Sequence, residues 1–251
     1  MTDMSLLIPL FFLTALVYSL VGFGGGSTYL ALLALFSFPY ESMPKVALLC
    51  NLVVVSGGCW FFIRAGHLPF RKILPFLLTS IPMAYLGGRI PISKTVFFWL
   101  LGVSLLAAAF RLFIVDRDFE SSHVLSTKKV WGIGLPVGAL LGLISGLVGI
   151  GGGIFLSPLL LVMGWTNAKE SAAAASLFIL INSLSGLTGQ FTKGGLPVES
   201  TIVFSLMFAV FLGGQIGSRL GAGKSVSIPL LEKVIASLLL FASGRLLYQS
   251  F

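Results

Sequence analysis

The sequence predicts an all-α polytopic membrane protein built from two homologous repeats, and three observations support this prediction. Hydrophobic residues make up 57% of the 251-residue chain and charged residues only 10%. A soluble domain carries about 25% charged residues. Apolar segments of bilayer-spanning length follow one another to the end of the chain. A glycine motif that interrupts the first of these segments returns in the second half of the chain.

The repeated motif is V-G-F-G-G-G at positions 21–26 and V-G-I-G-G-G at positions 148–153, 127 residues later. Glycine destabilises the interior of a helix, so two glycine clusters inside apolar segments require an explanation. An unbroken helix over residues 5–36 would be about 48 Å long, against a hydrocarbon core of about 30 Å. We therefore expect the opening segment of each repeat to be a helix that breaks at its glycines.

Each repeat is expected to hold four to five helical segments in the same order. The first repeat, residues 1–115, has apolar segments over 5–36, 46–63, 73–86 and 95–115. The second repeat, residues 130–251, has apolar segments over 130–163, 171–191, 202–216 and 228–248. Turns that contain proline and glycine separate the segments, and the polar stretch 116–129 is the predicted connector between the repeats.

Three further landmarks keep the two halves in register. Residues 47–52 align with 172–177 at an offset of 125, and Leu68-Pro69 aligns with Leu196-Pro197 at an offset of 128. Residues 87–90 align with 217–220 at an offset of 130. A slowly drifting offset that is kept in order along the chain indicates an old duplication. Internal duplication is frequent in secondary transporters, which bind their substrate where the repeats meet.

The orientation of the repeats follows from the distribution of Lys and Arg, and two arrangements compete. If each split segment crosses the membrane once, the repeats are parallel and the 16 basic residues divide into nine and seven. If each split segment returns to its starting side, the repeats are inverted and the 16 divide into eleven and five. The positive-inside rule favours the inverted arrangement, with both termini outside and the connector in the cytoplasm.

Two stripes of small residues predict close helix packing, because small residues at a spacing of four let helix backbones approach in lipid. These stripes are Gly138, Gly142 and Gly146 in the first case and Gly213, Gly217 and Gly221 in the second.

The remaining composition argues against several functional classes. The formal charge of +8 is expected to anchor helix ends at lipid headgroups rather than to bind nucleic acid. Cys50 and Cys59 fall on opposite faces of one segment, and His67 and His123 lie in polar connections, so no metal site is indicated. No Walker motif or nucleophile–base pair is present. We therefore expect no cofactor and no enzymatic activity.

The glycine clusters are the first candidate binding site. A helix that begins after a break points its first N–H groups, and the positive end of its dipole, back at the break, which favours an anion. Ser27 and Thr28 follow the first cluster and could cap the new helix or donate to an oxyanion, whereas Ile154 and Phe155 stand after the second. The alternative is that the glycines only permit a kink and close packing.

Two equivalent pairs of polar side chains complete the candidate site. Asn51 and Ser176 lie at matching positions within apolar segments and could bind a substrate, or could join helices by hydrogen bonds. Arg89 and Arg219 each end a segment and could contact an anion, or could serve as helix-end anchors. The candidate substrate-binding residues are Gly24, Gly25, Gly26, Ser27, Thr28, Asn51, Arg89, Gly151, Gly152, Gly153, Ser176 and Arg219.

The doubled V-G-x-G-G-G motif, followed about 25 positions later by Asn51 and Ser176, resembles the sulfite exporter TauE/SafE family of membrane permeases. The resemblance covers the whole chain and implies a multi-pass inner-membrane protein that transports a sulfur-containing anion such as sulfite, a sulfonate or sulfoacetate. The doubled break and the scarcity of acidic residues within the apolar segments favour a secondary transporter that works by alternating access, with an anion channel as the alternative. Membrane lipids, and a further copy of the chain in a homo-oligomer, are the other expected partners.

Overall fold

The computed structural model describes residues 6–20, 22–114, 127–195, 200–223 and 229–249. Within these ranges the chain forms helices joined by turns and contains no strand, which confirms the prediction of an all-α protein. The predicted connector lies largely outside the described residues, as does the Leu196-Pro197 landmark.

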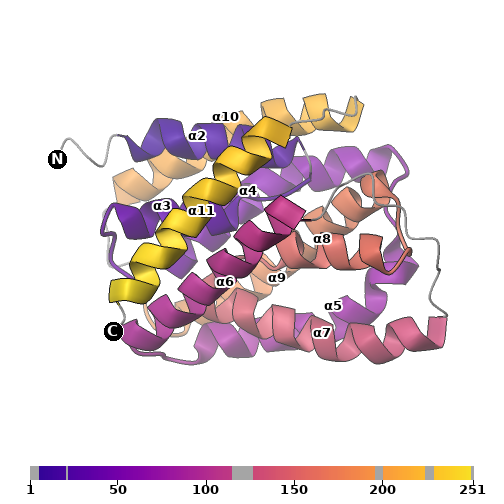
Figure 1. The fold of residues 1–251 in the computed structure, drawn as a ribbon, viewed down its shortest axis with the longest axis horizontal. Helices are drawn as coiled ribbons and strands as arrows, with labels where there is room; N and C mark the ends of the chain where they lie inside the picture. The colour runs from indigo at the N-terminus through magenta and orange to yellow at the C-terminus, as the bar shows by residue number, and fades with distance from the viewer. Residues whose placement is uncertain (1–5, 21, 115–126, 196–199, 224–228, 250–251) are drawn as a thin grey trace.

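Ten helices make up the described chain (Figure 1). The first half holds α2 (Leu7–Ser19), α3 (Gly26–Leu35), α4 (Met43–Arg64), α5 (Phe70–Arg89) and α6 (Lys94–Ile114). The second half holds α7 (Thr127–Val148), α8 (Gly153–Val162), α9 (Ala168–Phe191), α10 (Ser200–Gly223) and α11 (Pro229–Gln249).

Length separates the helices that can cross a membrane from those that cannot do so alone. Within the described residues, α4, α7, α9 and α10 are long and apolar enough to span a bilayer. By contrast, α3 and α8 have 10 residues each. At a rise of 1.5 Å per residue each is about 15 Å long, or half of the hydrocarbon core. The opening segment of each half is thus a helix, a break and a half-length helix, as the glycine motif predicts.

Helices from different halves form the closest pairs. In Figure 1, α2 and α10 lie together along one edge and α5 and α7 lie along the opposite edge. Helices α6 and α11 lie side by side in front of the others. The predicted glycine stripes line both edge pairs. A Cβ added at Gly138, Gly142 or Gly146 of α7 would meet the backbone of α5. One added at Gly213 or Gly217 of α10 would meet the backbone of α2, and one at Gly221 would meet that of Leu20, the C-cap residue of α2. Glycine is therefore required for both contacts.

The central helices α4 and α9 cross between the edge pairs and run antiparallel. A Cβ added at Gly186 would lie 3.5 Å from Leu48, and one added at Gly58 would lie 3.7 Å from Ser176, so the numbering rises along one helix as it falls along the other. Parallel repeats would make these equivalent helices parallel. The antiparallel arrangement is the one that inverted repeats require, although the equivalence of the halves itself stays a prediction.

Several helices extend beyond their predicted bounds. Helix α4 begins at Met43 because Pro44 is tolerated in a first turn, and α9 begins at Ala168 after a capping box between Asn167 and Glu170. Helix α5 spans Phe70–Arg89, against the predicted 73–86, and contains Pro75 and Pro82. Helix α7 starts at Thr127, inside the predicted connector.

Candidate functional site: two glycine breaks between the central helices

The two breaks share a left-handed backbone conformation at two equivalent pairs of glycines, and the second break has one more such residue, Gly151, with φ of +87°. Gly22 and Gly149 have φ of +80° and +93°, and Gly25 and Gly152 have φ of +84° and +76°. Both pairs are separated by the 127-residue offset of the motif. Gly25 and Gly152 are the N-cap residues of α3 and α8. Residues with a side chain are strained in this left-handed region, so the breaks depend on glycine at these four positions.

The two breaks lie against each other. A Cβ added at Gly26 would be 2.5 Å from the carbonyl oxygen of Ile150 in the second break and 2.6 Å from Nδ2 of Asn51. A Cβ added at Gly24 would be 2.5 Å from Oδ1 of Asn51, and one added at Gly151 would be 2.8 Å from Nδ2 of Asn51. Glycine at positions 24, 26 and 151 therefore permits contact between the breaks around the amide of Asn51.

The equivalent side chains Asn51 and Ser176 each reach the break of the opposite half. Nδ2 of Asn51 donates to the carbonyl of Ile150 at 3.2 Å, and Oγ of Ser176 donates to the carbonyl of Gly22 at 2.7 Å. Both side chains are fully buried. Breaking a helix in lipid frees backbone carbonyls that need a donor, and these two residues supply one at each break.

Unused polar groups remain at the same place. The amides of Gly26, Ser27 and Thr28, which open α3, donate no hydrogen bond to another described residue. Oδ1 of Asn51 and Oγ of Ser183 are buried and have no partner in the described part of the chain. The Ser183 oxygen would lie 3.4 Å from a Cβ added at Gly151. Buried polar groups are normally paired, so these groups point to a ligand or water at the breaks.

The hydroxyl groups after the first break face inward toward α2. Oγ1 of Thr28 lies 2.8 Å from the hydroxyl of Tyr18, and Oγ of Ser27 lies 3.4 Å from it. Gly25 is the N-cap residue of α3 and no side chain caps that helix, so Ser27 and Thr28 do not cap it. Both hydroxyls are buried within a turn of the break, and they join α2 to α3 across it.

The two arginines lie apart from the site. The Arg89 guanidinium stands over the ring of Tyr85 at 5.7 Å, and that of Arg219 stands over the ring of Phe61 at 5.8 Å. Both arginine residues are exposed. This placement corresponds to the helix-end anchor, the alternative considered for both residues.

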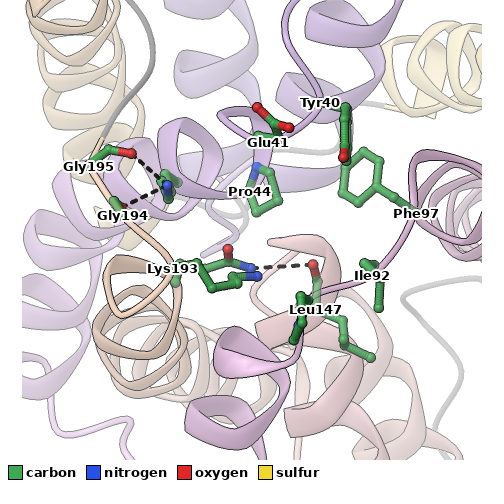
Figure 2. Close-up of a pocket in the computed structure, with 12 residues that line it drawn as sticks. Tyr40, Glu41, Pro44, Ile92, Phe97, Leu147, Lys193, Gly194 and Gly195 are labelled. Carbon is green, nitrogen blue, oxygen red and sulfur yellow. Dashed lines mark hydrogen bonds between the residues drawn. The ribbon is translucent and has the colours of Figure 1, made fainter.

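A cavity of about 500 Å³ lies beside the second break (Figure 2). Lys45 and Lys193 line it, together with Gln190, whose Nε2 donates to the carbonyl of Gly146 at 2.6 Å. Sequence reasoning did not select these residues, because a lysine at a segment end is normally a topological anchor. The only signal was that the inverted arrangement places Lys45 and Lys193 on the same side.

The described residues contain no group of three or more His, Cys, Asp or Glu side chains that could hold a metal ion. Cys50 and Cys59 are free and buried.

Comparison with known proteins agrees with this architecture. Residues 7–246 match the family described as Sulfite exporter TauE/SafE. The chain is 33% identical over 237 residues to "Probable membrane transporter protein y4hK" of Sinorhizobium fredii, which covers 93% of this chain and 94% of that relative. It is 28% identical to a "Probable membrane transporter protein" of Xylella fastidiosa, with 92% of each chain covered. It is 21% identical to "Probable membrane transporter protein YunE" of Bacillus subtilis, with 97% of each covered. No solved structure matches.

Proposed function

The chain belongs to the sulfite exporter TauE/SafE family, and on that premise we propose that it is a secondary transporter that moves a small sulfur-containing anion across the inner membrane by alternating access. The family and the apolar helices identify the chain as a multi-pass membrane transporter. We propose in addition that its substrate contains sulfur, that it works by alternating access and that it lies in the inner membrane.

One observation carries the proposal: two half-length helices begin at breaks that touch each other in the centre of the bundle. The amides at the start of α3, which have no partner among the described residues, carry the positive end of its dipole, and a small oxyanion is the ligand that such a terminus favours. Neutral donors at this depth also suit a substrate that must be released, because they bind without the strength of a fixed countercharge.

The way the halves are joined supports the proposal of alternating access. The hydrogen bonds from Asn51 and Ser176 cross from each half to the break of the other, and they are the polar ties between the breaks. An anion that enters between the breaks would replace these ties with its own oxygens. The halves could then rock against each other around a fixed central site, as inverted-repeat transporters do.

Flux into proteoliposomes tests the proposal. We expect labelled sulfite or propanesulfonate to enter vesicles that contain the purified protein, and Gly26→Leu to abolish this flux because its side chain would separate the breaks. Gly132→Leu is the matched control, since a Cβ at Gly132 of α7 meets no atom within 4 Å. Absence of anion flux, or equal flux in Gly26→Leu, would reject the proposal. Single-channel current steps in place of saturable flux would favour the anion channel.

A further inference from the structure

The cavity beside the second break is separate from the break itself but shares a wall with it. Pro44 lines the cavity, and a Cβ added at Gly149 would lie 2.6 Å from Cα of Pro44. Leu147, another lining residue, stands two positions before Gly149 at the end of α7. Gln190 binds the end of α7 through the carbonyl of Gly146. A molecule in this cavity is therefore separated from the second break by a single layer of residues.

Two lysines give the cavity its charge. Lys45 is only 4% exposed, and its ammonium donates to the carbonyls of Gly194 and Gly195 at 3.0 and 2.7 Å. These two bonds leave one of its three protons for a ligand. Lys193 donates to the carbonyl of Ile90 at 3.4 Å, a long contact that leaves its ammonium largely available.

The acid in the cavity does not neutralise both lysines. Glu41 lines the same cavity and is exposed, but no ion pair within 4.0 Å joins it to Lys45 or Lys193 among the described residues. Two ammonium groups against one carboxylate leave a net charge of about +1 in the cavity, which suits a ligand with a single negative charge.

Partial burial and, second, the nearby charge of Lys45 lower the pKa of Lys193 to about 8. The surroundings of Lys193 therefore disfavour its charged form, and a bound anion would stabilise that form.

The rest of the lining is apolar. Pro91, Ile92, Phe97 and Leu147 form this wall, and Figure 2 shows Ile92, Phe97 and Leu147 across from Lys193. Pockets for small organic ligands have volumes of roughly 300 to 1,000 Å³ and combine an apolar lining with a few polar groups. The cavity has this character, and it is far larger than a bare inorganic oxyanion requires.

We propose that the cavity between Lys45, Lys193 and the Phe97 wall is a docking site for a small organic anion of single charge, from which the anion passes to the glycine breaks. The shared chemistry is an oxyanion head, sulfonate or carboxylate, that contacts the two ammonium groups, with a short apolar body against Ile92 and Phe97. This inference rests on the proposed function of the breaks, and it adds a second site that receives the anion before them.

Direct binding to the purified full-length protein tests the docking site. Isothermal titration calorimetry would measure the affinity for propanesulfonate, butanoate and inorganic sulfate. We expect propanesulfonate and butanoate to bind at least tenfold more tightly than sulfate. Lys193→Gln should weaken propanesulfonate binding at least tenfold. Lys94→Gln is the matched control, because Lys94 is exposed and stands over the Phe98 ring rather than in the cavity. It should bind like the wild type.

Other results would overturn the inference. Unchanged binding in Lys193→Gln, or an equal loss in Lys94→Gln, would reject a docking site at these lysines. Lys45→Met provides a second test, with a thermal-unfolding curve to show that the variant is folded. If propanesulfonate crosses the membrane with an unchanged KM in Lys193→Gln, the docking site fails and the proposed function stands. If binding depends on Lys193 but no anion crosses, the proposed function fails and the docking site stands.

Discussion

At one end of the α4–α9 pair, Lys72 and Glu170 form an ion pair of 3.0 Å. At the other end, Lys45 and Lys193 face a cavity of about 500 Å³ and form no ion pair within 4.0 Å in the described part of the chain. At the first end, the start of α9 meets the start of α5, the helix that follows α4. At the second end, the start of α4 meets the turn that follows α9. The two ends hold equivalent positions in the bundle but differ in charge. At one end, Lys72 is paired with Glu170, and at the other, Lys45 and Lys193 leave net positive charge beside the cavity.

This difference in charge distinguishes the two ends of the α4–α9 pair. The centre is similar in both halves, because each break has left-handed glycines at two equivalent positions and receives one hydrogen bond from the opposite half. The two lysines of the cavity would attract an anion, whereas the charges of Lys72 and Glu170 offset each other.

The largest expected effect comes from giving the cavity end a second acid. Lys193→Glu changes the local charge by two units and should raise the KM for propanesulfonate about a hundredfold, or about 2.7 kcal/mol. Concentration-dependent flux in proteoliposomes measures this. Lys193→Arg keeps the charge and should stay within about threefold of the wild type. Equal KM values for the Glu and Arg variants would show that charge at this end is irrelevant to transport.

The centre should respond symmetrically. Asn51→Ala and Ser176→Ala each leave one buried carbonyl, that of Ile150 or Gly22, without its donor. Each variant should lose about 1–3 kcal/mol of stability, and the two losses should agree within about 1 kcal/mol. Reversible unfolding in detergent measures both. A neutral effect in one variant and a large loss in the other would contradict the equivalence of the two breaks.

The cavity end should also depend on pH. The pKa of Lys193 is lowered to about 8, so its ammonium is charged below this pH and becomes neutral above it. The KM for propanesulfonate, whose own charge is constant in this range, should therefore rise about tenfold from pH 7 to pH 9. Tyr40, Glu41 and Lys45 also face the cavity. Lys193→Arg isolates the contribution of Lys193, since arginine stays charged and should flatten the profile.

The smallest effect is expected at the neutralised end. The side chains of Lys72 and Glu170 are 35% and 28% exposed, so their ion pair should contribute at most about 1 kcal/mol. Glu170→Gln removes the charge but keeps a side chain that can accept from the Asn167 amide in the capping box. It should lower stability by less than about 1 kcal/mol and leave the KM unchanged. A KM change as large as that of Lys193→Glu would show that both ends meet the anion.

The sequence alone predicts the breaks well, because glycine is so unfavourable inside an apolar helix that a cluster of glycines indicates an interruption. Gly25 and Gly152 end the breaks where the motif places them, and both glycine stripes lie at close helix contacts. The predicted helix bounds are less accurate near proline, since α4 begins at Met43, before Pro44, rather than at residue 46.

The partners of the site residues could not be predicted from the sequence. Asn51 meets Ile150 across 99 positions, and Ser176 meets Gly22 across 154. Lys45 meets Gly194 across 149 positions. Such contacts depend on how the helices of the two halves pack together, and short sequence patterns do not predict this packing. Arg89 and Arg219, at equivalent positions in the chain, are both exposed and each stands over an aromatic ring, and a role for them in anion binding stays a prediction.

Cysteine labelling on intact cells tests most directly whether the two ends face opposite sides of the membrane. Cys50 and Cys59 are buried, so the background from native thiols should be low. A membrane-impermeant maleimide should label Lys193→Cys from outside and should label Lys72→Cys only after the membrane is permeabilised. Labelling of Lys72→Cys from outside, or of both positions from the same side, would contradict the inverted arrangement on which the proposed transport mechanism depends.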